Sequence, residues 1–195
     1  MKSNLDGRNV EKFIDGISSS SDLNRMEFPE GIAIDWVARN IYWTDSGKKT
    51  IEVARLDDER TRSKSIPRVI LFDEQIQNPR GIAVHPSARF TYSILLTFFS
   101  FSYFFRLSSI YFIRYHLSFS RLFWSDWDRL YPRIEASNLD GSDRAVLVDS
   151  HIIMPNSLVV DVVANELCWA DGGGGRSRLH RMTNQWTGLG KIGKQ

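Results

Sequence analysis

The sequence contains little of what would assign it at once to a common function class. Among its 195 residues there is one cysteine, Cys168, so an internal disulfide is excluded. The formal net charge is only +2, which gives no reason to expect a nucleic acid as partner. The first seven residues, MKSNLDG, lack the apolar stretch of a signal peptide. We expect one globular domain that is long enough to bury a core.

A six-residue pattern occurs three times along the chain. It is Asn-Ile-Tyr-Trp-Thr-Asp at 40–45, Arg-Leu-Phe-Trp-Ser-Asp at 121–126 and Glu-Leu-Cys-Trp-Ala-Asp at 166–171. Each copy predicts a buried strand that ends in a turn-forming carboxylate. The residues that define this structural motif are Tyr42, Trp43, Asp45, Phe123, Trp124, Asp126, Trp169 and Asp171.

Further matches extend the pattern to a unit of four strands. A turn containing proline opens the first strand of each unit, and an alternating apolar and polar segment predicts the third. The additional strands are expected at 29–35, 79–85 and 155–161 (first), 51–57 and 134–140 (third), and 68–72 and 144–148 (fourth). The period is about 45 residues once a loop insertion is discounted, and four strands at such a period predict a β-propeller.

Residues 90–120 interrupt this pattern with a different composition. They hold eight of the 12 phenylalanines and contain no Asp, Glu, Gly or Pro. The apolar run 94–113 is long enough to span a bilayer, but Arg106 lies near its middle and the block splits a hairpin. We therefore interpret it as a segment foreign to the domain, such as translated intron, with a genuine apolar loop as the alternative. Removing it restores the period.

The repeat divides the chain into units. We expect a partial blade at 1–28, a blade at 29–78, a blade at 79–154 interrupted by 90–120, a partial blade at 155–182 and a disordered tail at 183–195. Residues 3–7 match 137–141, which predicts that the chain starts inside a unit, at its third strand. Residues 179–182 predict a weak third strand.

No group of residues has the spacing of a catalytic or metal site. Asp45, Asp126 and Asp171 occupy the same place in each unit. A carboxylate that accepts backbone N–H groups in a turn explains this better than catalysis does. The tryptophans of the motif are interpreted as packing residues. The histidines are scattered, with no two at ligand spacing. We expect no catalytic residue, no metal and no cofactor.

These motifs resemble the Tyr-Trp-Thr-Asp (YWTD) repeats of the low-density-lipoprotein receptor class B family, which form six-bladed β-propellers. The resemblance implies an all-β fold, a partial six-bladed YWTD β-propeller of about three to four blades, each a four-stranded antiparallel sheet. Such an open arc exposes apolar faces at its ends. Within the family the sequence is most similar to the nidogen propeller, through the phrases at 78–81, 126–129, 132–135 and 167–169.

The chain departs from the family pattern at three positions. Ser157 stands where glycine is usual and His85 where aspartate is usual, so both turns are expected to be modestly looser. In nidogen-like repeats Cys168 would be expected to have a partner downstream, and none follows.

The resemblance implies a non-catalytic, secreted extracellular protein that docks a laminin-type partner in basement membrane. Glu30, Arg80 and Asn156, in the proline turns, are then expected at the channel mouth, with Trp127 and Tyr131 on the same face. No nucleic acid and no membrane is expected as partner. The alternatives are a lipoprotein-receptor-type ectodomain and a calcium-dependent propeller hydrolase in which Glu30 and Asn156 donate oxygen ligands.

Overall fold

Every regular element in the described part of the chain is a β-strand. The computed structural model describes residues 4–10, 26–56, 67–86, 92–97, 110–115, 120–173, 175 and 177–183. The antiparallel sheets are β1 (Pro29–Asp35), β2 (Asn40–Asp45), β3 (Thr50–Arg55) and β4 (Arg68–Phe72); β5 (Pro79–His85), β8 (Arg121–Asp126), β9 (Arg133–Asn138) and β10 (Ala145–Val148); β11 (Pro155–Asp161), β12 (Glu166–Asp171) and β13 (Arg178–Thr183); and the pair β6 (Tyr92–Thr97) and β7 (Ile110–Tyr115). Among these residues no helix has the length and hydropathy needed to cross a bilayer.

The predicted all-β propeller fold is confirmed. The first two blade sheets have four strands in consecutive spatial order, and the described residues of the last blade sheet form three. The first and second strands of each unit begin and end where the sequence predicts, whereas β3 and β9 end two residues earlier than expected. The third strand expected at 179–182 is present as β13, which pairs with β12 along its whole length. Residues 184–195 of the predicted tail lie outside the described residues.

The three blade sheets stack side by side and repeat the same register. The first strands β1, β5 and β11 each lie at one edge of their sheet, and β5 contacts both of the others. Each of them carries an irregularity just after its opening proline and then places an aliphatic residue opposite the tryptophan of the second strand. These pairs are Ile32 with Trp43, Ile82 with Trp124 and Leu158 with Trp169. The repeated register shows that the sequence repeat is a structural repeat.

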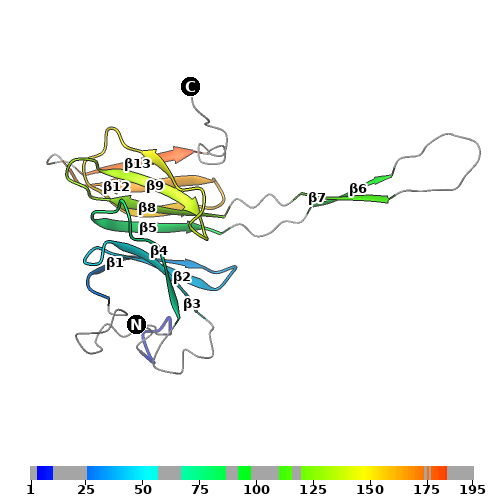
Figure 1. Cartoon of the computed structure of the whole chain (residues 1–195), viewed down its shortest axis with the longest axis horizontal. Coiled ribbons are helices and arrows are strands. Elements are labelled where there is room, and N and C mark those ends of the chain that lie inside the picture. Colours follow the sequence, from blue (N-terminus) through cyan, green and yellow to red (C-terminus); the bar gives the residue numbers. More distant parts are fainter. Residues whose placement is uncertain are drawn as a thin grey trace, which may run out of the picture.

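The described strands of the block at 90–120 join none of the blade sheets. Its described strands, β6 and β7, pair only with each other and extend away from the stacked sheets (Figure 1). His85 and Arg121, on the two sides of the block, are directly paired across β5 and β8. In the other two units Asp35 and Asp161 accept backbone N–H groups to close the tight turn that joins the first two strands, whereas the corresponding residue here is His85.

The core consists of apolar layers between neighbouring sheets. Trp124, fully buried, points toward the preceding sheet and packs 4.8 Å from Phe72, whereas Phe123 points toward the following sheet. The indole N–H groups of Trp43, Trp124 and Trp169 have no hydrogen-bond acceptor among the described residues. The tryptophans therefore contribute through packing, as the sequence predicts.

The motif aspartates clamp each first strand to its second strand. Each carboxylate accepts the backbone N–H groups of the two residues that lead into the opening proline. The pairs are Glu27 and Phe28 on Asp45, Gln77 and Asn78 on Asp126, and Ile153 and Met154 on Asp171. Asp45 and Asp126 are fully buried, so these hydrogen bonds replace most of the bonds to water that the carboxylates lose on burial.

The turn near the start of the chain repeats a turn of the second blade. The Gly7 N–H donates to the Asn4 carbonyl at 3.0 Å, as that of Gly141 donates to Asn138, and both glycines have positive φ. The Arg8 N–H donates to the Asp6 carboxylate at 2.9 Å, and the Ser142 N–H donates to the Asp140 carboxylate at the same distance. The predicted match of residues 3–7 to 137–141 thus extends to the conformation of residues 4–8.

Candidate binding face at the proline turns

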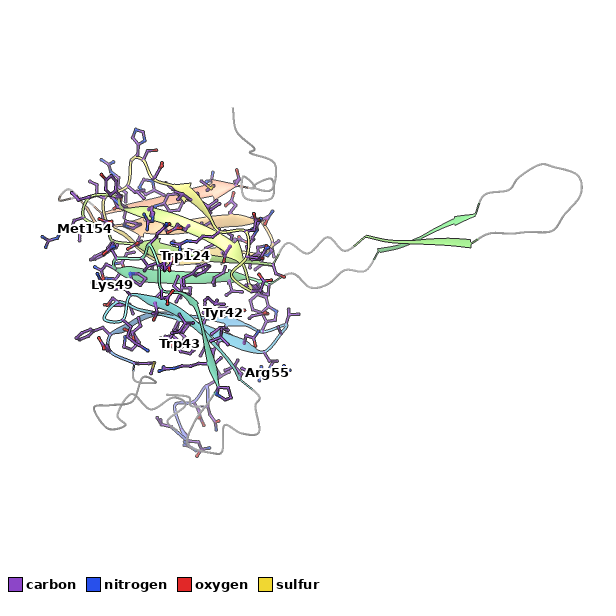
Figure 2. All side chains as sticks on the ribbon, viewed as in Figure 1. Tyr42, Trp43, Lys49, Arg55, Trp124 and Met154 are labelled. Carbon is purple, nitrogen blue, oxygen red and sulfur yellow. The ribbon has the colours of Figure 1, made fainter. Side chains whose placement is uncertain are left out.

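The three variable residues of the proline turns meet in one hollow. Glu30, Arg80 and Asn156 come from three different sheets, yet all three line a cavity of about 190 Å³ at the start of the first strands β1, β5 and β11. Lys49 and Met154 mark this end of the sheets in Figure 2, and Arg55 marks the opposite end. The arrangement follows from the side-by-side packing of β1, β5 and β11, since each of these strands starts with its proline turn.

Arg80 is held in the hollow by partners from two blades. Its Nη1 lies 2.8 Å from a carboxylate oxygen of Glu30, and its guanidinium carbon lies 4.3 Å from the ring centroid of Trp127. Glu30 also accepts a hydrogen bond of 3.2 Å from the Ser46 hydroxyl, and the Trp127 indole N–H donates to the Pro155 carbonyl. An ion pair combined with a cation–π contact fixes the planar guanidinium before any partner arrives.

A hydroxyl group links each of the first two blades to the next one. The Thr44 hydroxyl accepts from the Gly31 N–H at 2.9 Å and donates to the Arg80 carbonyl at 2.7 Å. The Ser125 hydroxyl does the same between the Gly81 N–H, at 2.9 Å, and the Asn156 carbonyl, at 3.1 Å. These bridges fix the backbone of the residues that line the hollow. The sequence shows a small residue at this motif position, but it does not reveal the bridge.

The two aromatic residues expected on this face differ in their placement. Trp127 contacts Arg80 and is partly buried, so it forms part of the wall next to the hollow. Tyr131 is 70% exposed and does not line the cavity. Its loop is stabilised by the carboxylate of Asp128, which accepts the N–H of Leu130 at 2.9 Å. Tyr131 is therefore available at the surface, but the structure does not bring it together with the three turn residues.

The positions of Glu30 and Asn156 do not favour a calcium site. Arg80 lines the same hollow, and its positive guanidinium already pairs with the Glu30 carboxylate. A divalent cation at Glu30 would have to displace this charge or be repelled by it. Among the described residues, no group of three or more His, Cys, Asp or Glu side chains could hold a metal ion.

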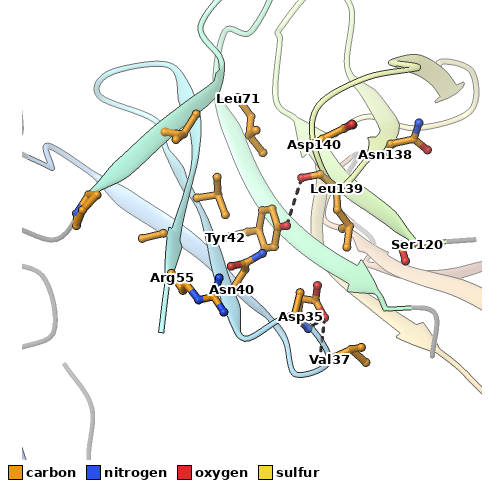
Figure 3. Close-up of a pocket in the computed structure, with 15 residues that line it drawn as sticks. Asp35, Val37, Asn40, Tyr42, Arg55, Leu71, Ser120, Asn138, Leu139 and Asp140 are labelled. Carbon is orange, nitrogen blue, oxygen red and sulfur yellow. Dashed lines mark hydrogen bonds between the residues drawn. The ribbon is translucent and has the colours of Figure 1, made fainter. Parts of the chain in front are cut away.

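A larger hollow lies at the opposite end of the first two blades, and the sequence did not predict it. It measures about 820 Å³ and is bordered by the ends of β1, β3 and β9 (Figure 3). The Tyr42 hydroxyl projects into this region and donates to the Leu139 carbonyl at 3.2 Å, which links the two blades. The wall is largely aliphatic, with Asp35, Arg55 and Asp140 among its polar residues.

Tyr42 gives the first prediction, which concerns alkaline pH. Burial raises the pKa of Tyr42 above its usual value. The unfolded chain therefore ionises this phenol at about pH 10 while the folded chain keeps it protonated, so its contribution to stability is full below that pH and decreases above it. We expect Tyr42→Phe to flatten this alkaline decrease and to cost about 1 kcal/mol at neutral pH through the lost hydrogen bond.

The measurement is urea unfolding of both proteins between pH 8 and 11. Tyr131→Phe serves as control, because Tyr131 is 70% exposed and its hydroxyl lies outside this contact. An equal alkaline decrease in the wild-type chain and in Tyr42→Phe would show that another group titrates.

The repeat also identifies the family. Residues 39–86 and 120–162 match the low-density lipoprotein receptor repeat class B. The chain carries class B repeats. The first matched range ends just before the apolar block and the second begins at its end, which agrees with the direct pairing of β5 with β8.

Curated relatives and solved structures place these class B repeats close to nidogen. A human low-density lipoprotein receptor-related protein 5-like protein is 30% identical over 160 residues, which is 82% of this chain and 48% of that protein. Nidogen of Drosophila melanogaster is 38% identical over 169 residues, which is 86% of this chain and 9% of nidogen. The chain thus spans half or less of the relatives that it matches.

Two solved structures share the fold. A chain from the crystal structure of a nidogen/laminin complex is 30% identical, with a TM-score of 0.55 over 82% of this chain and 51% of that chain. A luciferin-regenerating enzyme has a TM-score of 0.50 over 83% of this chain and 47% of its own, at 13% identity, which shows the fold alone. The class B repeats of this chain therefore form part of a nidogen-like propeller.

Proposed function

We propose that this chain is part of a non-catalytic extracellular propeller that docks a laminin-type protein on its proline-turn face. The observation that carries the proposal is the convergence of Glu30, Arg80 and Asn156, from three successive blades, on one hollow. Similarity to nidogen, and to a chain solved in a nidogen/laminin complex, supports the choice of partner.

The hollow suits recognition of a polar loop. Arg80 offers fixed N–H donors, Glu30 offers acceptors, and the amide of Asn156 offers both. Arginine and tryptophan are the residue types that most often dominate binding energy at protein interfaces, and Arg80 lies against Trp127. Because the side chains of Arg80 and Glu30 already hold each other, docking requires little rearrangement of this pair. No step of this mechanism needs a catalytic group.

The alternative is an ectodomain propeller of the lipoprotein-receptor type. Its support is the 30% identity to the human receptor-related protein 5-like protein over most of this chain. Both candidates would use an extracellular propeller, but they differ in partner. A laminin-binding measurement therefore separates them.

The second prediction concerns charge reversal at Arg80. Arg80→Glu replaces an ion pair with two adjacent carboxylates and removes the cation from the face of Trp127. We expect saturable binding of the wild-type chain to immobilised laminin in biolayer interferometry, and at least about tenfold weaker binding of Arg80→Glu. Arg55→Glu, an equal change of charge at an exposed position at the opposite end of the blades, is expected to bind like the wild type.

The proposal is contradicted if the wild-type chain shows no saturable binding. It is also contradicted if Arg80→Glu and Arg55→Glu bind equally, because binding would then depend on net charge and not on this hollow.

A further inference from the structure

The segment that leads into the central proline turn needs support from its surroundings. Residues 73–78 join β4 of the first blade to β5 of the second, and Arg80 follows after Pro79. Within this segment Ile76 is 2% exposed, and Gln75 has a φ of 56°, a backbone conformation that residues other than glycine rarely adopt. The course of this segment determines where the turn that carries Arg80 begins.

Two arginines of the second blade provide this support. Arg144 donates to the Glu74 carbonyl at 2.9 Å and to the Gln75 carbonyl at 3.1 Å. Arg133 also donates to the Gln75 carbonyl. The guanidinium carbon of Arg144 lies 4.9 Å from the centre of the Phe72 ring, so this arginine also contacts the first blade directly. Both arginines therefore bind the backbone of the segment.

Glu135 holds both arginines in place. Its carboxylate accepts a hydrogen bond from Arg133 at 2.8 Å and two from Arg144, at 2.7 and 3.0 Å. The Glu135 side chain is 4% exposed, and charge-assisted hydrogen bonds are stronger where water is excluded. The planar fork of an arginine can bind a carboxylate and a carbonyl at the same time, which a lysine ammonium does less well. We call Glu135, Arg133 and Arg144 the Glu135 cluster.

The Glu135 cluster is connected to the hollow. Arg133 also pairs with the Asp126 carboxylate at 3.3 Å, and Asp126 accepts the N–H groups of the last two residues of the segment. The second of these, Asn78, accepts the backbone N–H of Trp127 at 2.9 Å on its carbonyl. The ring of Trp127 in turn lies 4.3 Å from the guanidinium carbon of Arg80. A continuous series of contacts thus leads from the cluster to Arg80.

Formation of a blade sheet does not require a carboxylate at this place. Glu135 lies opposite the motif tryptophan of its blade, as Glu52 does in the first blade and His180 in the last. His180 stacks on the Trp169 ring, with 5.2 Å between the ring centroids. Since β12 and β13 pair along their whole length with a histidine at this place, a role for Glu135 beyond its own sheet is to be sought in the segment that its arginines bind.

We propose that Glu135 is a positioning residue for partner binding, which fixes the place of Arg80 in the hollow through its two arginines. The proposal rests on the proposed function, since it takes Arg80 as a main contact with the laminin-type protein. The Glu135 side chain is 4% exposed, so its effect on binding is indirect. Without the carboxylate the segment samples other positions, the partner meets Arg80 in its binding position less often, and the complex dissociates faster.

Glu135→Gln in the full chain tests this role, because it removes the charge and keeps the shape of the side chain. In biolayer interferometry on immobilised laminin we expect it to dissociate at least about fivefold faster than the wild type. Arg144→Lys keeps the positive charge but loses the fork, and we expect faster dissociation from it too. Asp35→Asn is the matched control, an equal change at a buried carboxylate of the opposite end, and is expected to dissociate like the wild type.

Amide hydrogen exchange followed by NMR reports on the segment without any partner. The N–H groups of Gln77 and Asn78 are bonded to a carboxylate of the second blade, which Glu135→Gln leaves in place. We expect both amides to exchange at least about tenfold faster in this variant. The Leu56 N–H, which donates to the Arg39 carbonyl in the first blade, is expected to exchange as in the wild type. A general loss of stability would instead accelerate exchange at both places.

Three results would overturn the role of Glu135. Unchanged exchange of the Gln77 and Asn78 amides in Glu135→Gln would show that the cluster does not fix the segment. Faster exchange with unchanged dissociation from laminin would show that the segment does not position Arg80, and the proposed function would stand. A wild-type chain that does not bind laminin would overturn the proposed function and the role of Glu135 in binding with it. Circular dichroism verifies folding, and Arg144→Lys decides the test if Glu135→Gln does not fold.

Discussion

Trp124→Ala is expected to lower the free energy of unfolding by about 4 kcal/mol, the typical cost of removing a fully buried tryptophan. Trp124 is 0% exposed and fills the layer between the first two blades, 4.8 Å from Phe72. The guanidinium of Arg144 lies 5.5 Å from the centre of its ring, so the substitution also removes a cation–π contact. The loss therefore combines a cavity with a broken contact between blades.

Urea unfolding followed by tryptophan fluorescence and circular dichroism measures this loss. Trp36→Ala is the matched control, because Trp36 is 55% exposed and lies outside the core layers. We expect the control to change the free energy of unfolding by less than about 0.5 kcal/mol. Equal effects of the two substitutions would mean that the layer between the blades does not stabilise the fold.

Asp126→Ala is expected to cost about 3 to 4 kcal/mol, the second largest effect. The Asp126 carboxylate is fully buried, accepts the backbone N–H groups of Gln77 and Asn78, and pairs with Arg133 at 3.3 Å. Its removal takes the acceptor from two part-buried backbone N–H groups and takes one of its acceptors from the Arg133 guanidinium, which keeps Glu135. It also leaves a cavity at a fully buried position, and the loss of several bonds at one site adds up to this cost.

Asp128→Ala provides the comparison for this prediction. Asp128 also accepts backbone N–H groups, those of Leu130 and Tyr131, but in an exposed loop where water replaces the lost acceptor. We expect it to cost about 0.5 to 1 kcal/mol in the same unfolding assay. If Asp126→Ala were no more destabilising than Asp128→Ala, the clamp between second and first strand would not be a determinant of the blade.

The strand arrangement could be predicted because the motif repeats at nearly constant spacing. A tryptophan two residues before each motif aspartate establishes the second strand. The proline turn establishes the first strand, fourteen residues before Trp43 and Trp169 and, across the apolar block, 45 residues before Trp124. The same spacing identified 90–120 as a block outside the blades, and β6 and β7 indeed pair with no blade strand. The third strand expected at 179–182 is also present, and β13 is longer than expected by one residue at each end because Arg178–Thr183 has too little apolar alternation to indicate its full length.

The sequence placed the three turn residues at equivalent points of their units, but it did not reveal how they interact. The period places Glu30, Arg80 and Asn156 at equivalent points, so their convergence follows once the first strands are neighbours. The ion pair between Arg80 and Glu30 depends on side-chain conformations that the spacing does not contain. The hydroxyl bridges of Thr44 and Ser125 were missed for a related reason, because threonine and serine at a strand end equally suit an exposed position.

The most direct test of the account is an alanine scan of laminin binding at both ends of the blades. Glu30→Ala, Arg80→Ala and Asn156→Ala change the proline-turn hollow, whereas Asn40→Ala and Arg55→Ala change the hollow at the opposite end. We expect all three proline-turn variants to bind more weakly, Arg80→Ala by at least about tenfold, while the two others bind like the wild type. Loss of binding in Asn40→Ala or Arg55→Ala, with unchanged binding in the first three variants, would contradict it.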